Sequence, residues 1–215
     1  MNKLVIDLEM ADKAVVNNIR IHEIIEIGAV LLDENNNILG TYQSYVRNEH
    51  GRISKTITDL TGIDETKTAA APKLIDVFKD IEDKFCKLDT SETILYTWSE
   101  NDTAEITKEM QAKRLRHPGV EQMCAKYIDI QQIFSERIHL QKAMNLTKAL
   151  NLIGIEFDGK EHGALDDAIN TAKMLQLLEG EDLQELIDKI HKLLEGEPMV
   201  NTMGSLFDFS TLKLE

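Results

Sequence analysis

The first residues that could do chemistry are two acids, Asp7 and Glu9, set in an apolar run near the amino terminus. Leu4, Val5 and Ile6 predict a short buried strand here, because few exposed strands are so apolar. Side chains alternate faces along a strand, so both carboxylates point the same way and lie close together. Two buried like charges are costly unless a cation neutralises them, and oxygen ligands suit magnesium or manganese. The pair predicts a divalent metal site; the alternative is a strand end where both acids reach water.

Two later stretches carry residues of the same chemical kind. A predicted strand at residues 93–98 delivers Asp102 to the start of a helix, at the edge where open α/β sheets bind ligands. An aspartate at this position is otherwise most often a helix cap. His162 and Asp167 stand at the start of another helix, with Asp166 beside them. Histidine exchanges its proton near neutral pH, so His162 is a candidate general base; the alternative is a residue that bonds the backbone at a helix entry.

The elements that must position these residues follow from the hydrophobic pattern. Strand-like runs at 23–33 and 38–46, joined by an Asn-rich turn, predict an antiparallel hairpin, and the first strand beside them completes a three-stranded meander. The polar connection 11–22 is predicted to be a loop. Strand–helix units follow, with strands at 93–98 and 127–130 and helices at 54–62, 72–85, 102–116 and 140–152, and a further helix with Ala168, Ala172 and Leu175 on its inner face. This order predicts an α/β fold, a mixed sheet with helices on both faces.

Composition narrows the class of protein. A chain of 215 residues is long enough for one ordinary domain with a real core, and no run approaches the length of a membrane span. The first residues lead straight into the strand and resemble neither a signal nor a transit peptide. Cys86 and Cys124 are too few for a disulfide framework, so a cytoplasmic protein is expected. The net charge of −14 argues against broad attraction to nucleic acid, but a bound metal can reverse the local field.

The last part of the chain is predicted to be an appendage, residues 181–215, on a domain of residues 1–180. Residues 183–194 form an amphipathic helix that either packs back on the domain or forms a homodimer face. The tail beyond it ends in apolar residues. Its run Met203-Gly204-Ser205-Leu206-Phe207 resembles the Gln-x-x-Leu-Phe peptides that bind sliding clamps, with Met203 in place of the glutamine.

Taken together and in this order, the acids and the histidine resemble the DEDDh 3′-to-5′ exonucleases of the ribonuclease H-like fold. The resemblance covers about residues 3–178. It includes three further runs: Glu23-Ile24-Ile25-Glu26-Ile27-Gly28-Ala29-Val30, Leu60-Thr61-Gly62-Ile63, and His162-Gly163-Ala164-Leu165-Asp166-Asp167-Ala168. The last run is the most specific of them.

The resemblance implies a site and a reaction. The four metal-binding carboxylates of the family fall on Asp7, Glu9, Asp102 and Asp167, and its general base falls on His162. The family spacing His-x-x-x-x-Asp selects Asp167, and its neighbour Asp166 is expected to face solvent or to favour the helix dipole. Two divalent cations, Mg²⁺ or Mn²⁺, are implied. The implied reaction releases nucleoside 5′-monophosphates from single-stranded RNA or DNA with a free 3′ end.

Departures from the family pattern bear on the substrate. Proofreading exonucleases usually carry Gly-His-Asn before the third acid, where this chain has a run that includes Trp98. Met10 agrees with oligoribonucleases, but Ala11-Asp12 replaces their Thr-Gly. Leu8, Met10 and Trp98 are expected to bind the terminal nucleotide. The chain resembles the RNA-trimming and sporulation-inhibitor-like branches more closely, so RNA is favoured. The alternatives are a DNA proofreading or repair exonuclease, a catalytically idle interaction module, and a structural domain with incidental acids.

Overall fold

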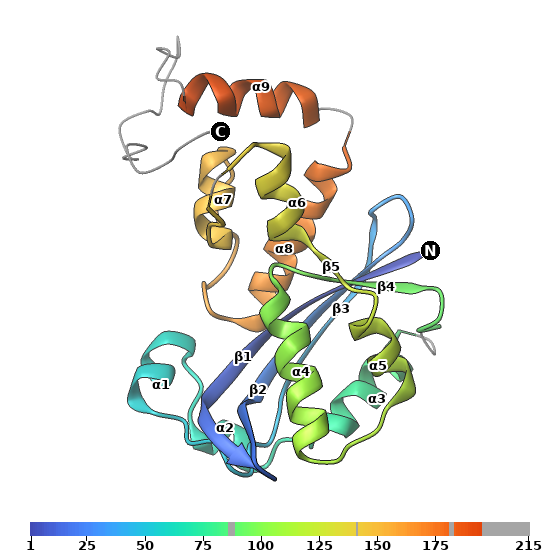
Figure 1. The fold of residues 1–215 in the computed structure, drawn as a ribbon, viewed down its shortest axis with the longest axis vertical. Coiled ribbons are helices and arrows are strands. Elements are labelled where there is room, and N and C mark those ends of the chain that lie inside the picture. Colours follow the sequence, from blue (N-terminus) through green and yellow to red (C-terminus); the bar gives the residue numbers. More distant parts are fainter. Residues whose placement is uncertain (86–88, 141, 181–182, 195–215) are drawn as a thin grey trace.

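A five-stranded mixed sheet runs through the computed structural model, which describes residues 1–85, 89–140, 142–180 and 183–194. Its order is β3-β2-β1-β4-β5 (Figure 1). The strands are β1 (Asn2–Val16), β2 (Ile19–Leu32), β3 (Ile38–Tyr45), β4 (Thr93–Thr97) and β5 (Ile128–Asp129). Neighbouring strands among β1, β2 and β3 are antiparallel, whereas β4 runs parallel to β1 and to β5. The predicted meander and mixed sheet are confirmed.

Helices cover both faces of the sheet, as predicted. One apolar layer contains residues of α3 (Leu74–Lys84), α4 (Glu100–Ala112) and α5 (Pro118–Cys124). The other contains residues of α6 (Ile130–Arg137), α7 (Leu146–Leu152), α8 (Ala164–Leu178) and α9 (Leu183–Leu194). Alternation along β1 sends Leu4, Ile6 and Leu8 into the first layer and Val5 into the second. Asp7 and Glu9 continue the Val5 face of the strand, toward α8.

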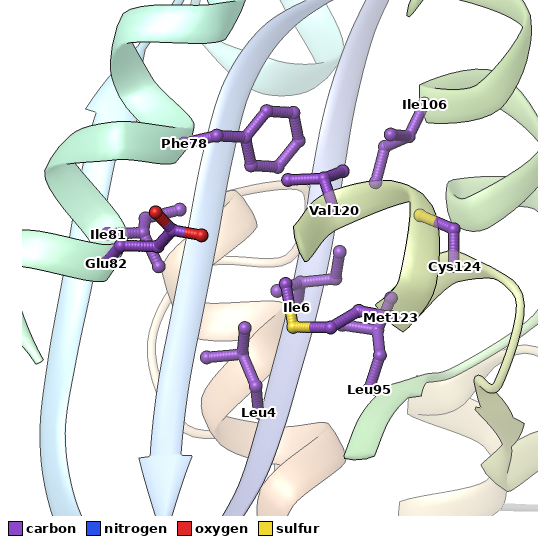
Figure 2. Close-up of a pocket in the computed structure, with 10 residues that line it drawn as sticks. All are labelled: Leu4, Ile6, Phe78, Ile81, Glu82, Leu95, Ile106, Val120, Met123 and Cys124. Atoms are coloured by element: carbon purple, nitrogen blue, oxygen red, sulfur yellow. The ribbon is translucent and has the colours of Figure 1, made fainter. Parts of the chain in front are cut away.

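The first layer encloses a small void that is separate from the acids. Its lining is almost wholly apolar and includes Leu4, Ile6, Phe78 and Met123 (Figure 2). The cavity measures about 10 Å³, which is room for about one water molecule. A void of this size and lining is a packing imperfection of the core and not a ligand site.

The prediction of a loop at residues 11–22 is wrong. These residues extend β1 and open β2, and the two strands turn at Asn17 and Asn18, whose φ angles are 48° and 64°. Positive φ at both central residues is the geometry of a type I′ hairpin turn, which asparagine tolerates. The register between the strands slips between Met10 and Lys13, so the hairpin carries a bulge. Polar side chains in residues 11–22 interrupt the apolar pattern by which a strand is predicted from sequence.

Helix boundaries differ from the prediction in three places. The helix expected at 140–152 begins only at Leu146, with the Asn145 side chain accepting the Lys148 N–H at 2.9 Å. The helix expected to reach residue 116 ends at Ala112, and Arg114 takes a left-handed φ of 56°. The short helices α2 (Glu65–Ala69), α5 and α6 were not predicted. The short helix ending at Gly62 is confirmed as α1 (Lys55–Thr61), with Gly62 at a φ of 78°.

The final helix packs on its own domain. Ile187 and Ile190 of α9 are buried in the same layer as Leu150 and Leu175. Figure 1 shows α9 lying across the end of the molecule formed by α6, α7 and α8. The residues of the clamp-like run and Cys86 lie outside the described residues. Among the described helices, none is long and apolar enough to cross a bilayer.

Gly28→Ala is expected to destabilise the fold strongly. A Cβ atom at Gly28 on β2 would stand 2.1 Å from the Ala164 carbonyl oxygen, where α8 begins, and backbone cannot yield as a side chain can. We expect a loss of about 3 kcal/mol, by the usual cost of overpacking, and a fall in Tm of about 6–12 °C. Thermal unfolding measures it. Gly40→Ala on β3 is the control, because the nearest atom there is in the Phe85 ring, 3.2 Å away. An equal, small effect of both changes would contradict the close approach.

Candidate active site

The fold brings together the four predicted carboxylates. Asp7 and Glu9 lie on β1, and Asp102 lies in the first turn of α4, directly after the parallel strand β4. Asp167 lies in the first turn of α8. Asp102 is not the helix cap, because Ser99 is the N-cap residue and its hydroxyl accepts the Asn101 N–H. The Asp102 carboxylate is therefore left to the site, where it repels Asp7.

Burial and mutual repulsion make this cluster costly without a cation. Desolvation, followed by the charges of Asp102, Asp167 and Glu9, raises the pKa of Asp7 well above its usual value. Glu9 is 8 % exposed, and desolvation with the charge of Asp167 raises its pKa to about 8. Desolvation is also the main cause that raises the pKa of Asp102 and that of Asp167 to about 7. The ammonium group of Lys160 opposes the shift at Glu9.

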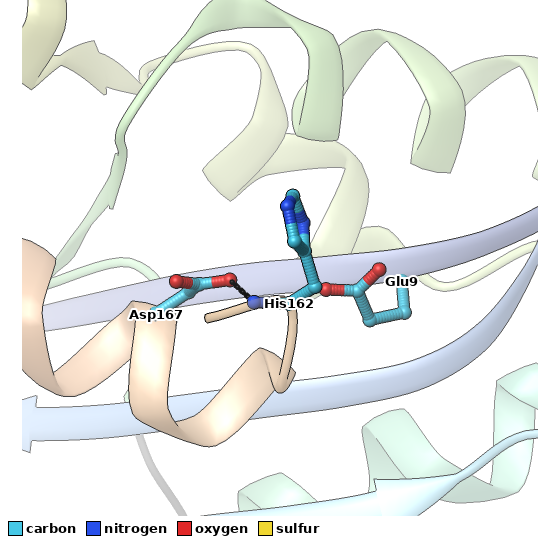
Figure 3. Close-up of side chains that lie close together, drawn as sticks. All are labelled: Glu9, His162 and Asp167. Atoms are coloured by element: carbon cyan, nitrogen blue, oxygen red, sulfur yellow. Dashed lines mark hydrogen bonds between the residues drawn. The ribbon is translucent and has the colours of Figure 1, made fainter. Parts of the chain in front are cut away.

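The residues fit a divalent metal centre. Carboxylate oxygens are the ligands that magnesium and manganese prefer, and a cation would remove the repulsion described above. Ligand atoms of Glu9, His162 and Asp167 all lie within 4.8 Å of one another. Figure 3 shows the Asp167 and Glu9 carboxylates on either side of the His162 backbone, with the His162 ring extending away from both. Asp7 and Asp102 belong to the same acidic cluster, because, besides desolvation, the charge of Asp167 raises the pKa of both.

The loop before α8 holds His162 in an unusual backbone conformation. Its φ is 62°, in the left-handed region that non-glycine residues seldom adopt. The His162 backbone N–H donates to the Asp167 carboxylate at 3.1 Å, so the imidazole of this exposed residue is not the group that Asp167 binds (Figure 3). Asp166 lies in the first turn of α8, as expected of an acid that favours the helix dipole, and its carboxylate also accepts the Lys160 N–H at 2.9 Å. The two neighbouring aspartates together fix the loop that presents the His162 ring.

Sequence reasoning missed Glu26, a buried acid that faces the site. Glu26 on β2 pairs with Glu9 in register and is 3 % exposed. Its carboxylate accepts the Ala164 N–H at 3.1 Å and the Gln43 side-chain N–H at 2.7 Å. Glu26 thus binds the first residue of α8 to β2. This contact helps to position the first turn of α8, which carries Asp167, relative to the sheet. Its only signal in the sequence is an acid that interrupts an otherwise apolar strand.

A second group of charged residues that the sequence did not predict binds α4 to the sheet. The Glu109 carboxylate accepts the Ile24 N–H of β2 at 2.7 Å, and Lys113 pairs with Glu109 at 2.7 Å and with Glu23 at 2.6 Å. Glu23 in turn accepts backbone N–H groups of the loop at residues 49–51. Both glutamates are fully buried, so the network ties α4, which carries Asp102, to β2 and to that loop.

An open cleft adjoins the acids. Its lining combines acids with polar and apolar side chains: Asp7, Met10, His22, Trp98, Ser99, Asn101, Asp102 and Glu105. Two of the residues predicted to bind the terminal nucleotide, Met10 and Trp98, are among them. Trp98 is also a core residue, 8 % exposed, with its ring 6.2 Å from that of Phe134. The third, Leu8, is buried in the layer that contains α3 and α4 and is not part of the cleft lining.

Without metal, the protein is expected to lose stability as pH rises from about 4 to about 8, between the unfolded and the folded pKa values of its clustered acids. Carboxyl groups whose pKa is raised by folding contribute stability below their unfolded pKa and lose it as pH rises through the folded pKa, here about 7 to 8 for Glu9, Asp102 and Asp167. At about 1.4 kcal/mol for each pKa unit, the rise of the Glu9 pKa from 4.5 to about 8 alone corresponds to about 5 kcal/mol, or about 10–20 °C in Tm. Thermal unfolding in a chelator measures it. Excess Mg²⁺ or Mn²⁺ should restore the Tm at high pH; an unchanged Tm in the chelator would contradict the acidic cluster.

Comparison with known proteins agrees with this geometry. The model of the RNase T family, described as exonuclease, matches residues 4–175. The rat 3′-5′ exoribonuclease 1 is 27 % identical over 195 residues, which are 86 % of this chain and 54 % of that protein. The mouse ERI1 exoribonuclease 2 is 31 % identical over 175 residues, 70 % of this chain and 24 % of that one. This chain thus spans about half the length, or less, of these curated relatives.

Two solved structures share the fold. One, described as 3′-end specific recognition of histone mRNA stem-loop by 3′-exonuclease, has a TM-score of 0.69 at 28 % identity, covering 86 % of this chain and 82 % of that one. The other is the nuclease domain of 3′hExo, a DEDDh family member bound to rAMP, with a TM-score of 0.68, 28 % identity and coverage of 86 % and 92 %. These matches confirm the predicted ribonuclease H-like fold. Since the family model spans the sheet, all four carboxylates and the histidine, this chain belongs to the RNase T exonuclease family.

Proposed function

We propose that this chain is a metal-dependent 3′-to-5′ exonuclease that removes nucleoside 5′-monophosphates from single-stranded RNA. The observation that carries the proposal is the buried set of Asp7, Glu9, Asp102 and Asp167 beside His162, at the mouth of an open cleft. Buried carboxylates that repel one another give a structural domain no stability. They suit a site that holds cations and receives a phosphodiester.

Each residue has a role in this proposal. Asp7, Glu9, Asp102 and Asp167 would hold two divalent cations, which supply a nucleophile at neutral pH and neutralise charge on the attacking and leaving oxygens. His162 would take the proton of the attacking water as general base. Its ring extends from a loop whose backbone Asp167 already binds, so the imidazole nitrogens stay available to solvent.

RNA is proposed over DNA because of the relatives. The rat relative is called an exoribonuclease, and the related nuclease domain binds rAMP. The cleft beside the acids contains Met10 and Trp98, which offer a nucleotide an apolar surface and an aromatic ring. A nucleotide bound against these residues would bring its phosphate to the metal-binding carboxylates.

Digestion of matched oligomers tests the function. Single-stranded RNA and DNA of one sequence, labelled at the 5′ end, would be incubated with the protein and Mg²⁺, Mn²⁺ or a chelator. The proposal expects a ladder that shortens from the 3′ end, faster on RNA, with nucleoside 5′-monophosphates released and no reaction in the chelator. Intact RNA with both metals would reject it, and equal or faster digestion of DNA would reject the proposed substrate.

Location and assembly are further parts of the proposal. The half-buried thiol of Cys124 is free, which supports a reducing compartment such as the cytoplasm. A homodimer stays a prediction, and so does the division of the chain at residue 180. Ile187 and Ile190 of α9 are buried against the chain's own core, so a dimer would use other surfaces. Mass in solution, measured with and without residues 195–215, tests the dimer.

A further inference from the structure

His22 is the residue of the cleft whose role neither the acidic cluster nor the family assignment explains. It lies on β2 in the part of the hairpin that was not expected to be a strand, and it lines the cleft together with Asp7, Met10 and Trp98. Both its backbone and its ring are fixed. The His22 N–H donates to the Glu105 carboxylate at 3.0 Å, and Glu105 is held by Lys108 at 2.6 Å.

The ring is oriented by the bulge in the hairpin. His22 Nδ1 lies 3.0 Å from the carbonyl oxygen of Ala11, in the stretch between Met10 and Lys13 where the ladder slips. A carbonyl oxygen only accepts hydrogen bonds, so Nδ1 carries the hydrogen of the neutral imidazole. Nε2 of that neutral form is an acceptor. Within the part of the chain that the structure describes, no hydrogen bond engages this second nitrogen.

The other polar groups of the cleft have roles of their own. Asp7 and Asp102 belong to the acidic cluster, the Ser99 hydroxyl caps α4, and Glu105 binds both the His22 backbone and Lys108. Asn101 lies in the first turn of α4 and offers an amide with donors as well as an acceptor. The Ala11 carbonyl thus orients the His22 ring, and Nε2 of its neutral form is an acceptor in a cleft that is otherwise rich in acidic side chains.

The chemistry of a nucleotide limits what can bind such an acceptor. Phosphate oxygens only accept hydrogen bonds, so they would not pair with Nε2. Base edges carry donors, but the base changes at every step of an exonuclease, and a fixed contact would favour one base. The sugar is constant, and the 2′-hydroxyl is the donor that distinguishes RNA from DNA. We propose that His22 reads the sugar, with Nε2 accepting a hydrogen bond from the 2′-hydroxyl of a nucleotide bound in this cleft. This inference rests on the proposed function and adds a residue that determines its specificity.

Two substitutions of His22 test the role of Nε2 separately from the role of Nδ1. His22→Asn keeps an amide donor near the position of Nδ1 for the Ala11 carbonyl and removes the acceptor at Nε2. His22→Gln places an amide oxygen near the position of Nε2. Val15→Ala is the control, because Val15 is exposed on the same hairpin and does not line the cleft. Circular dichroism and thermal unfolding establish that each variant is folded.

The readout is kcat/KM on three matched oligomers: RNA, 2′-fluoro RNA and DNA. The 2′-fluoro sugar keeps a ribose-like shape but has no donor. The parent protein and Val15→Ala should prefer RNA over 2′-fluoro RNA by about 3–10-fold, the usual worth of one neutral hydrogen bond. His22→Asn should bring this ratio close to one by slowing RNA alone, and His22→Gln should restore part of it.

Several outcomes would overturn the inference. A folded His22→Asn variant that keeps the preference for RNA, or that slows all three substrates equally, would show that His22 does not read the 2′-hydroxyl. A parent protein with no preference between RNA and 2′-fluoro RNA would show the same. If His22→Asn does not fold, a His22→Gln variant that loses the preference rejects the inference, and one that keeps it supports an acceptor at this position. A parent that digests none of the three rejects the proposed function itself, and the sugar contact with it.

Discussion

Asp7→Asn is expected to lower nuclease activity by several orders of magnitude while it raises the thermal stability of the metal-free protein. Desolvation raises the pKa of Asp7 most, and the charges of Asp102, Asp167 and Glu9 raise it further. Asparagine has nearly the same shape but no charge, so one ligand charge is lost from the proposed cation site of four carboxylates. The same change relieves repulsion in the metal-free fold.

Three measurements on purified Asp7→Asn test this result. RNA digestion gives the loss of activity, titration calorimetry with Mn²⁺ gives the loss of affinity, and unfolding in a chelator at pH 8 gives the gain in Tm. Asp59→Asn is the control, because Asp59 is an exposed acid of α1 that pairs with Lys55. It should leave all three values at those of the parent protein. A folded Asp7→Asn protein that digests RNA at the parent rate would remove Asp7 from the site.

The residues that could be predicted from the sequence are those with a local pattern. Asp7 and Glu9 stand in one apolar strand, and alternation alone places them on the face away from Leu8. Asp102 and Asp167 each lie in the first turn of a helix that the hydrophobic pattern indicates. Since β4 runs parallel to β1, the two carboxylates of β1 and Asp102 meet at one edge of the sheet. Their assignment as one site came from the family resemblance and not from these patterns.

The supports of the site could not be predicted, because they depend on contacts between distant segments. Glu26 binds the backbone of residue 164, and Glu109 binds that of Ile24; nothing in the local sequence of either glutamate points to its partner. The position of His22 depends on a bulge and on a hairpin that polar residues conceal. Trp98 was expected only as a nucleotide contact, yet most of its surface is buried against Phe134. Such roles follow from tertiary packing and not from periodicity.

His162→Ala is expected to lower turnover on RNA by about 10²–10⁴-fold, the usual worth of a general base, while metal still binds. The Asp167 carboxylate binds the backbone of residue 162 and not its ring, so removal of the imidazole leaves the proposed metal ligands in place. A general base must be neutral, so the activity of the parent protein should rise with pH through the neutral range, and the residual activity of the variant should lack that rise.

The control for His162 must distinguish the effect of losing the imidazole from the effect of placing alanine at a positive φ. Alanine is disfavoured at the φ of 62°, whereas asparagine tolerates it and cannot act as a base, so His162→Asn should be as inactive as His162→Ala and more stable. His139→Ala is the matched control, because His139 is also exposed with a φ of 55°, but it stacks on His191. It should keep full activity and show the cost of alanine in this conformation. Titration with Mn²⁺ then decides the role of His162. Loss of metal binding in both His162 variants would make the imidazole a ligand, and the attacking water would need another base.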